Sequence, residues 1–167
     1  MKFPSLFFSI ICRLPFLNKV SFFFFLVFAT LSLSKANSQV VSEEFKRITD
    51  SLIKARPTTY EELDSVLNPK RTDTIYMRYF NNEALIKKYP IGRSYALNQL
   101  GRKYRDISNY PKAVALHEKA LEAALEANNL EFRVYSLNML GVVYRRSDAI
   151  KIALDYHQEA LELAESV

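Results

Sequence analysis

The chain has 167 residues, enough for one domain, and a formal net charge of +5. Residues 1–38 carry four basic residues and no acid, whereas the remainder carries 19 basic and 18 acidic residues, a net charge of +1. Residues 39–167 are therefore nearly neutral and lack the excess positive charge that is typical of a nucleic-acid-binding protein. With three glycines and one cysteine, the sequence also excludes a glycine-rich phosphate loop and an intrachain disulfide.

The first 38 residues predict an export signal. Arg13 and Lys19 precede an apolar run of 14 residues, Val20 to Leu33. A membrane-spanning helix needs ~20 residues, so the run has the length of a signal peptide rather than of a span. A helix buried in the fold is disfavoured, because the phenylalanine-rich run has no amphipathic period.

Small residues follow the apolar run. Ala36 and Ser38 have the spacing that a signal peptidase recognises, which predicts cleavage before Gln39, with a second register before Asn37. An uncleaved membrane anchor is the alternative, because residues 3–12 are also apolar. In either case we expect the remaining chain outside the cytoplasm, periplasmic or attached to the membrane.

Residues 39–90 predict a helical N-terminal extension. Apolar residues recur at helical spacing over 41–56, and a further helix is predicted over 74–88. Between them, Thr59 and Glu62 form the pattern of a capping box for a short helix that ends at residue 67. The end of this extension is compatible with the second helix of a degenerate repeat.

An internal repeat dominates the rest of the chain. Residues 94–126 align with residues 134–166 at a constant offset of 40. Leucine, glycine and tyrosine lie on one face of a first helix, and alanines lie on a second helix after a turn. The small side chains allow two antiparallel helices to approach closely, and the tyrosine fills the space beside them. The residues predicted to form this repeat core are Leu100, Gly101, Tyr104, Ala113 and Ala120 in one unit, and Leu140, Gly141, Tyr144, Ala153 and Ala160 in the other.

This pattern resembles the tetratricopeptide repeat, W-x2-L-G-x2-Y followed by A-x3-F and then A and P. The resemblance implies an all-α fold of antiparallel helical hairpins stacked as a right-handed superhelix, with units over 91–130 and 131–167. The period of 40 rather than 34 predicts longer helices. Departures from the pattern occur at the tryptophan, phenylalanine and proline positions, which hold Leu97 and Leu137, His117 and His157, and Leu125.

The first helix of each unit carries a recurrent polar set that we predict faces the concave side of the superhelix. Asparagine can pair with a peptide backbone, arginine with a carboxylate, and tyrosine supplies apolar area with a hydroxyl. The hypothesis is therefore a peptide-binding groove, and a merely solvated helix face is the alternative. The predicted binding residues are Tyr95, Asn98, Arg102 and Arg105 in the first unit, and Tyr135, Asn138 and Arg145 in the second.

The predicted function is a protein- or peptide-binding scaffold rather than an enzyme. No nucleophile lies beside a base, and His117 and His157 are expected to pack between helices, so no metal or cofactor is predicted. The chain resembles the sensory regions of exported or membrane-anchored regulators of Bacteroidetes-type bacteria. A self-assembling structural repeat is the alternative, and a small hydrolase is a weaker one. Because repeat arrays usually need three units, we expect further repeats or an output module in a longer chain.

Overall fold

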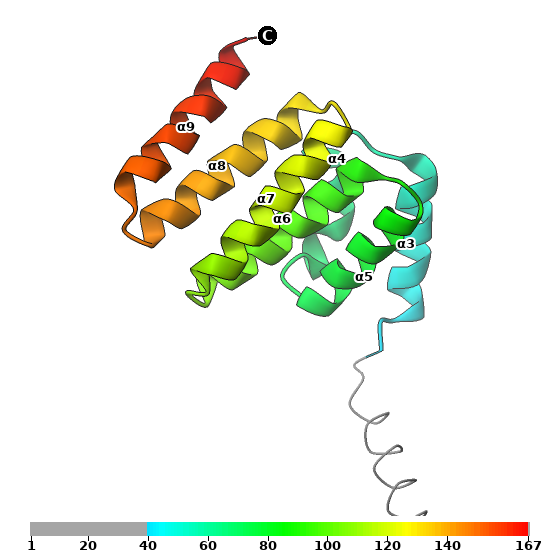
Figure 1. Ribbon diagram of the computed structural model, residues 1–167. Helices are drawn as coiled ribbons and strands as arrows, with labels where there is room; N and C mark the ends of the chain where they lie inside the picture. The colour runs from blue at the N-terminus through cyan, green and yellow to red at the C-terminus, as the bar shows by residue number, and fades with distance from the viewer. Residues whose placement is uncertain (1–39, 167) are drawn as a thin grey trace, which may run out of the picture. The chain divides into compact units, whose positions relative to one another are not determined.

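The computed structural model describes residues 40–166, and within that range every regular element is helical, which confirms the predicted all-α fold (Figure 1). None of these helices has the length and apolarity needed to cross a membrane. The predicted export signal lies outside the described residues. The elements are α3 (Glu43–Ala55), α4 (Tyr60–Leu67), the 3-10 turn η1 (Asn68–Lys70), α5 (Thr74–Ile86), α6 (Pro90–Asp106), α7 (Tyr110–Glu126), α8 (Leu130–Arg146) and α9 (Ile150–Glu165).

Local sequence signals start and stop these helices. The predicted capping box is confirmed, because the Thr59 side chain accepts from the backbone of Glu62 while the Glu62 carboxylate accepts from the backbone of Thr59. Each of the last four helix–helix connections passes through one residue in the left-handed conformation, which lets the chain reverse within a short turn. These residues are Lys88, Ser108, Asn128 and Asp148, with φ between 47° and 67°.

The repeat forms two antiparallel hairpins, α6 with α7 and α8 with α9, and α7 packs against α8 (Figure 1). Gly101 lies where α6 approaches α7, against the ring of His117, and Gly141 lies in the same way against His157. The eight predicted leucine, glycine and alanine core residues are buried, and Tyr104 and Tyr144 are half-buried.

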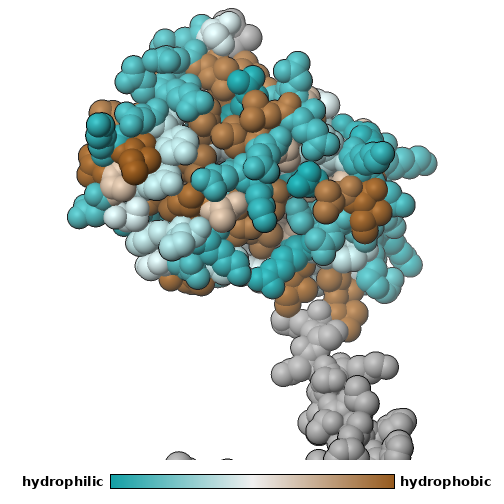
Figure 2. All heavy atoms as spheres, in the orientation of Figure 1, coloured by the Kyte–Doolittle hydropathy of each residue, from teal (hydrophilic) through white to brown (hydrophobic). Residues whose placement is uncertain are grey.

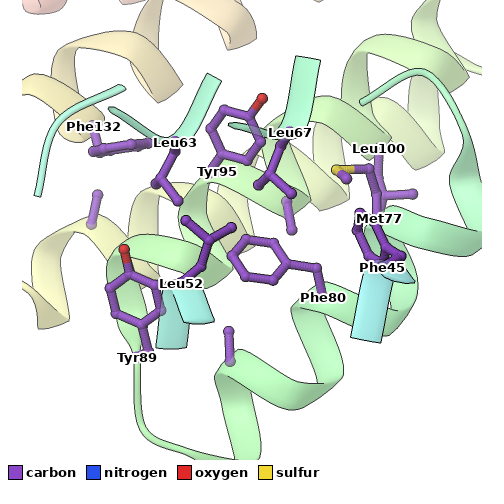
Figure 3. Packing of buried hydrophobic residues seen from close by; sticks show 13 residues of the cluster. Phe45, Leu52, Leu63, Leu67, Met77, Phe80, Tyr89, Tyr95, Leu100 and Phe132 are labelled. Carbon is purple, nitrogen blue, oxygen red and sulfur yellow. The ribbon is translucent and has the colours of Figure 1, made fainter. Parts of the chain in front are cut away.

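The main hydrophobic core lies between the N-terminal extension and the first hairpin (Figure 3). Phe45 and Leu52 of α3, Leu63 of α4 and Phe80 of α5 pack in one cluster with Tyr95 of α6. The extension is therefore part of the same folded unit as the repeats. Burial falls off toward the other end of the array, where only two alanines of α9 are buried, Ala153 and Ala160.

Candidate functional site

Two of the predicted groove residues are not on the surface. Tyr95 and Asn98 are both 0 % exposed, so the expectation that they face an open groove is wrong. The reason is tertiary: the Tyr95 hydroxyl donates to Asp64 of α4 at 2.7 Å, and the Asn98 amide donates to Ser136 of α8 at 2.9 Å. Helices α4 and α8 therefore cover the two side chains that the repeat pattern predicted to be exposed.

Asn98 is part of a buried polar relay that joins both hairpins. Its amide oxygen lies 2.8 Å from Nδ1 of His117, and its amide nitrogen donates to the hydroxyl of Ser136. The hydroxyl of Ser136 in turn donates to the carbonyl oxygen of Phe132 at 2.7 Å. Because a carbonyl oxygen only accepts, Nδ1 of His117 must carry the proton.

Burial, together with the positive charges of Arg105 and Arg102, lowers the pKa of His117 to about 3. The ring is therefore neutral at neutral pH. This histidine is fully buried between helices, as predicted, whereas His157 at the equivalent position is half-buried.

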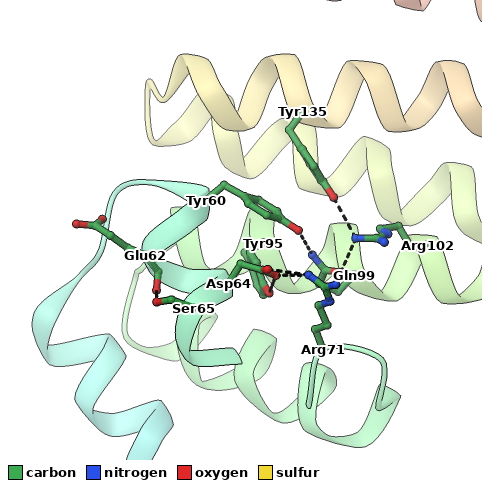
Figure 4. A network of polar contacts seen from close by, with 9 residues as sticks. All are labelled: Tyr60, Glu62, Asp64, Ser65, Arg71, Tyr95, Gln99, Arg102 and Tyr135. Atoms are coloured by element: carbon green, nitrogen blue, oxygen red, sulfur yellow. Dashed lines mark hydrogen bonds and ion pairs between the residues drawn. The ribbon is translucent and has the colours of Figure 1, made fainter. Parts of the chain in front are cut away.

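Helix α4 lies beside α6, and Tyr60, its first residue, reaches α8 (Figure 4). The ring of Tyr60 lies against Tyr135 and Tyr95, with centroids 4.8 and 5.4 Å away. The Tyr60 hydroxyl accepts a hydrogen bond from the side-chain amide nitrogen of Gln99. The amide oxygen of Gln99 in turn accepts a hydrogen bond from Arg102. Arg102 and Tyr135, both predicted to bind a peptide, thus contact a network centred on the chain's own N-terminal extension.

The ionised centre of this network is Asp64. Arg71 places one guanidinium nitrogen 2.7 and 2.8 Å from its two carboxylate oxygens. Burial raises the pKa of Asp64, but the hydrogen bonds from Arg71 and Tyr95 outweigh burial and leave the pKa below its usual value. Burial raises the pKa of the Tyr60 and Tyr95 hydroxyls, so both stay protonated.

The other predicted binding residues differ in their surroundings. Arg105 is only 11 % exposed and donates two hydrogen bonds to its neighbour Asp106. Asn138 and Arg145 are exposed, although they occupy the same repeat positions as Asn98 and Arg105. The structure therefore separates the two units: the first is covered, and the second keeps exposed polar groups.

Asn138 lies in a groove of about 480 Å³ on α8 and α9, which we call the α8–α9 groove. Figure 2 shows hydrophobic and hydrophilic residues interspersed over the face of the molecule that it draws. Leu161, 57 % exposed, is its largest exposed apolar side chain. The lining residues are Tyr60, Glu131, Val134, Tyr135, Asn138, His157, Ala160, Leu161 and Ala164.

The α8–α9 groove repeats a surface that is covered elsewhere in the chain. Forty residues earlier, Asn98, His117, Ala120 and Ala124 form the corresponding surface of α6 and α7, and all four are buried. Helix α8 packs on that surface. In the part of the chain that the structure describes, no helix packs in the same way on α9.

Sequence reasoning missed Ser136 and Tyr60. Ser136 occupies the repeat position that Ala96 holds in the first unit. This serine in place of an alanine was the one signal in the sequence that could have indicated a polar contact there. Tyr60 lies on a short helix without repeat character, and nothing in the local pattern indicates that its ring reaches α8.

The fold and these contacts define a class: a helical-hairpin repeat protein whose hairpins close around a glycine. The tetratricopeptide repeat family model matches residues 92–166, which include nearly all of α6 and the whole of α7, α8 and α9. The match supports a tetratricopeptide repeat protein, a class of typically non-catalytic scaffolds that bind other proteins. A search of curated proteins and a search of solved structures both found no match.

Proposed function

We propose that this protein is a protein-binding scaffold that receives a helix of a partner protein in the α8–α9 groove. One observation carries the proposal: the groove repeats the surface on which α8 packs, forty residues further along the chain. The internal contact of α8 with α6 and α7 is therefore a template for the partner. It favours a helix over the extended peptide that the sequence suggested.

The template also specifies the chemistry of the partner helix. At the covered surface, Asn98 donates to the hydroxyl of Ser136, a small residue that lets α8 approach closely. Asn138 occupies the same repeat position in the α8–α9 groove. A buried amide without a partner costs ~1–3 kcal/mol. The partner helix should therefore place a serine or threonine opposite Asn138. The residues on either side of it should be apolar and pack on Leu161.

The finer role that we propose is the sensory N-terminal part of an exported or membrane-anchored regulator. This rests on the apolar run of residues 20–33, on the small residues that follow it, and on the resemblance of the repeat region. In that role, a partner helix bound at the α8–α9 groove would report an event outside the cytoplasm.

The test uses the full chain and a synthetic peptide with the sequence of residues 129–147, which contains α8 and its caps. We expect saturable binding by fluorescence anisotropy, with an increase in helical circular dichroism. Leu161→Asp should weaken binding at least about tenfold, because it places a charge in the apolar groove. The matched control is Leu154→Asp, since Leu154 is 63 % exposed on the same helix but does not line the groove.

The peptide variant Ser136→Leu should also bind more weakly, because a large side chain does not fit against Asn138. Equal binding to the Leu161→Asp and Leu154→Asp chains would refute the proposed groove. Analytical ultracentrifugation of the full chain without peptide addresses the alternative: a stable oligomer that Leu161→Asp dissociates would mean that a second copy, rather than a partner, occupies the groove.

A further inference from the structure

A second groove lies between α5 and α7, with α6 as its floor, and we call it the α5–α7 groove. Its volume is about 430 Å³. Leu97 and Leu100 form an apolar floor, and the exposed Leu85 lies at its side. None of the residues that line this groove is acidic. The lining residues are Arg78, Asn81, Leu85, Arg93, Leu97, Leu100, Tyr104, Lys112, Leu116 and Lys119.

Two of the four cations have a tyrosine, rather than a carboxylate, as their contact. Arg78 donates to the hydroxyl of Tyr104 at 2.6 Å, and the ammonium of Lys112 lies 4.5 Å from the centre of the same ring. The hydrogen bond with Lys112, assisted by the charge of Arg78, lowers the pKa of Tyr104 although burial opposes the change. The positive charge in the groove is therefore only weakly compensated by the protein.

Arg93 has one weak ionic contact, with Glu126 at 3.4 Å, and that glutamate is 60 % exposed. Two buried atoms of the lining residues, Nε of Arg93 and Oδ1 of Asn81, have no hydrogen-bond partner within residues 40–166. One of these atoms is a donor and the other is an acceptor. The polar groups around this groove are therefore incompletely satisfied by the protein alone.

The repeat supplies an internal comparison, because the turns after α5 and α7 are also forty residues apart. The equivalent space between α7 and α9 keeps one of the four cations, as Arg133 in place of Arg93, and has no counterpart of the other three. Tyr156 stacks there on Tyr144, with ring centroids 5.5 Å apart and planes 8° apart. Folding of a hairpin of this kind thus does not require the three cations that the next repeat lacks. Four lining positions hold a different residue forty positions later: Arg78 corresponds to Glu118, Lys112 to Ile152, Leu116 to Tyr156 and Lys119 to Glu159.

We propose that the α5–α7 groove binds an acidic peptide segment that also carries a leucine-like side chain. Carboxylates of the segment pair with the arginines and lysines, and the apolar side chain lies on the leucines of the floor. A peptide also offers backbone N–H donors to an acceptor such as Asn81, which distinguishes it from a simple anion. The groove is separate from the α8–α9 groove, and the proposal does not depend on that site.

The test is a selection of displayed random octapeptides on the full chain, with the Arg78→Glu/Lys119→Glu variant used for counter-selection. These two changes copy the glutamates that the next repeat carries at the same positions. We expect the enriched peptides to contain aspartate or glutamate together with leucine-like residues. A synthetic copy should bind the parent chain and lose at least about tenfold in affinity, ~1.4 kcal/mol, with the variant.

Two controls make the result specific. The Arg146→Glu/Lys151→Glu variant has the same change in charge on exposed residues outside the groove, and it should bind the peptide as the parent does. The peptide with its acids changed to amides should not bind. Enriched peptides without excess acid, equal binding to both double variants, or displacement by an equal concentration of inorganic phosphate would each overturn the proposal.

Discussion

Replacing Gly101 by alanine tests the closest helix approach in the first hairpin. An added Cβ would lie 2.5 Å from Cε1 and 2.6 Å from Nε2 of His117, distances that real Cβ atoms do not adopt. The imidazole ring is fully buried, and its Nδ1 is bonded to Asn98 at 2.8 Å. The ring therefore cannot move aside without breaking the relay that reaches Ser136.

The expected cost follows from three effects, two of which destabilise the folded chain while the third stabilises it. Overpacking a tight core costs ~1–3 kcal/mol, and loss of the buried hydrogen bond adds about 1 kcal/mol. Alanine in place of glycine in a helix gains about 1 kcal/mol. We therefore expect Gly101→Ala to lower the free energy of unfolding by ~1–3 kcal/mol, the overpacking range, because the other two effects cancel.

The second hairpin supplies the matched control. A Cβ at Gly141 would lie 2.7 Å from Cε1 of His157, nearly as close. However, His157 is half-buried and borders the α8–α9 groove, so its ring has room to move outward. Gly141→Ala should thus change stability by less than ~1 kcal/mol, because the gain in helix propensity offsets a small rearrangement.

Urea unfolding followed by circular dichroism and by tyrosine fluorescence measures both variants, and coincidence of the two probes tests two-state behaviour. In a double-mutant cycle, His117→Ala should remove most of the cost of Gly101→Ala. Equal stability of the Gly101→Ala and Gly141→Ala chains, or additive effects in the cycle, would show that the ring does not restrict Gly101.

Three further predictions concern pH, the relay and export. As the pH falls below ~6.5, the unfolded state binds a proton that folded His117, with a pKa of about 3, does not, so stability should fall by up to ~1.4 kcal/mol per pH unit. Urea unfolding at pH 7 and pH 5.5 measures this loss of stability, which should be smaller in the His117→Gln variant. An equal loss of stability in the variant would show that His117 is not the group responsible. Ser136→Ala leaves the Asn98 amide without its acceptor and should cost ~1–3 kcal/mol in the same assay, whereas an unchanged stability would exclude a role for the relay. Expressed in a Gram-negative host, the exported chain should begin at Gln39 or Asn37 by N-terminal sequencing, and recovery of Met1 in the cytosol would refute export.

The hairpins and their turns could be predicted from the sequence because the forces that form them are local or periodic. The offset of 40 places Leu100, Gly101 and Tyr104 on one helix face, and the same spacing recurs from Leu140. The capping box of Thr59 and Glu62 needs only residues three apart. Helical periodicity also predicted α3 and α5 to within a few residues of their ends.

Exposure of the candidate binding residues depended on the tertiary structure. Asn98 and Asn138 occupy the same repeat position, yet α8 covers the first and no described helix covers the second. Helix α4, which has no repeat character, places Tyr60 against Tyr95 and Tyr135. Burial depends on contacts between segments far apart in the chain, and a periodic pattern describes only the face on which a residue lies, not what packs against that face.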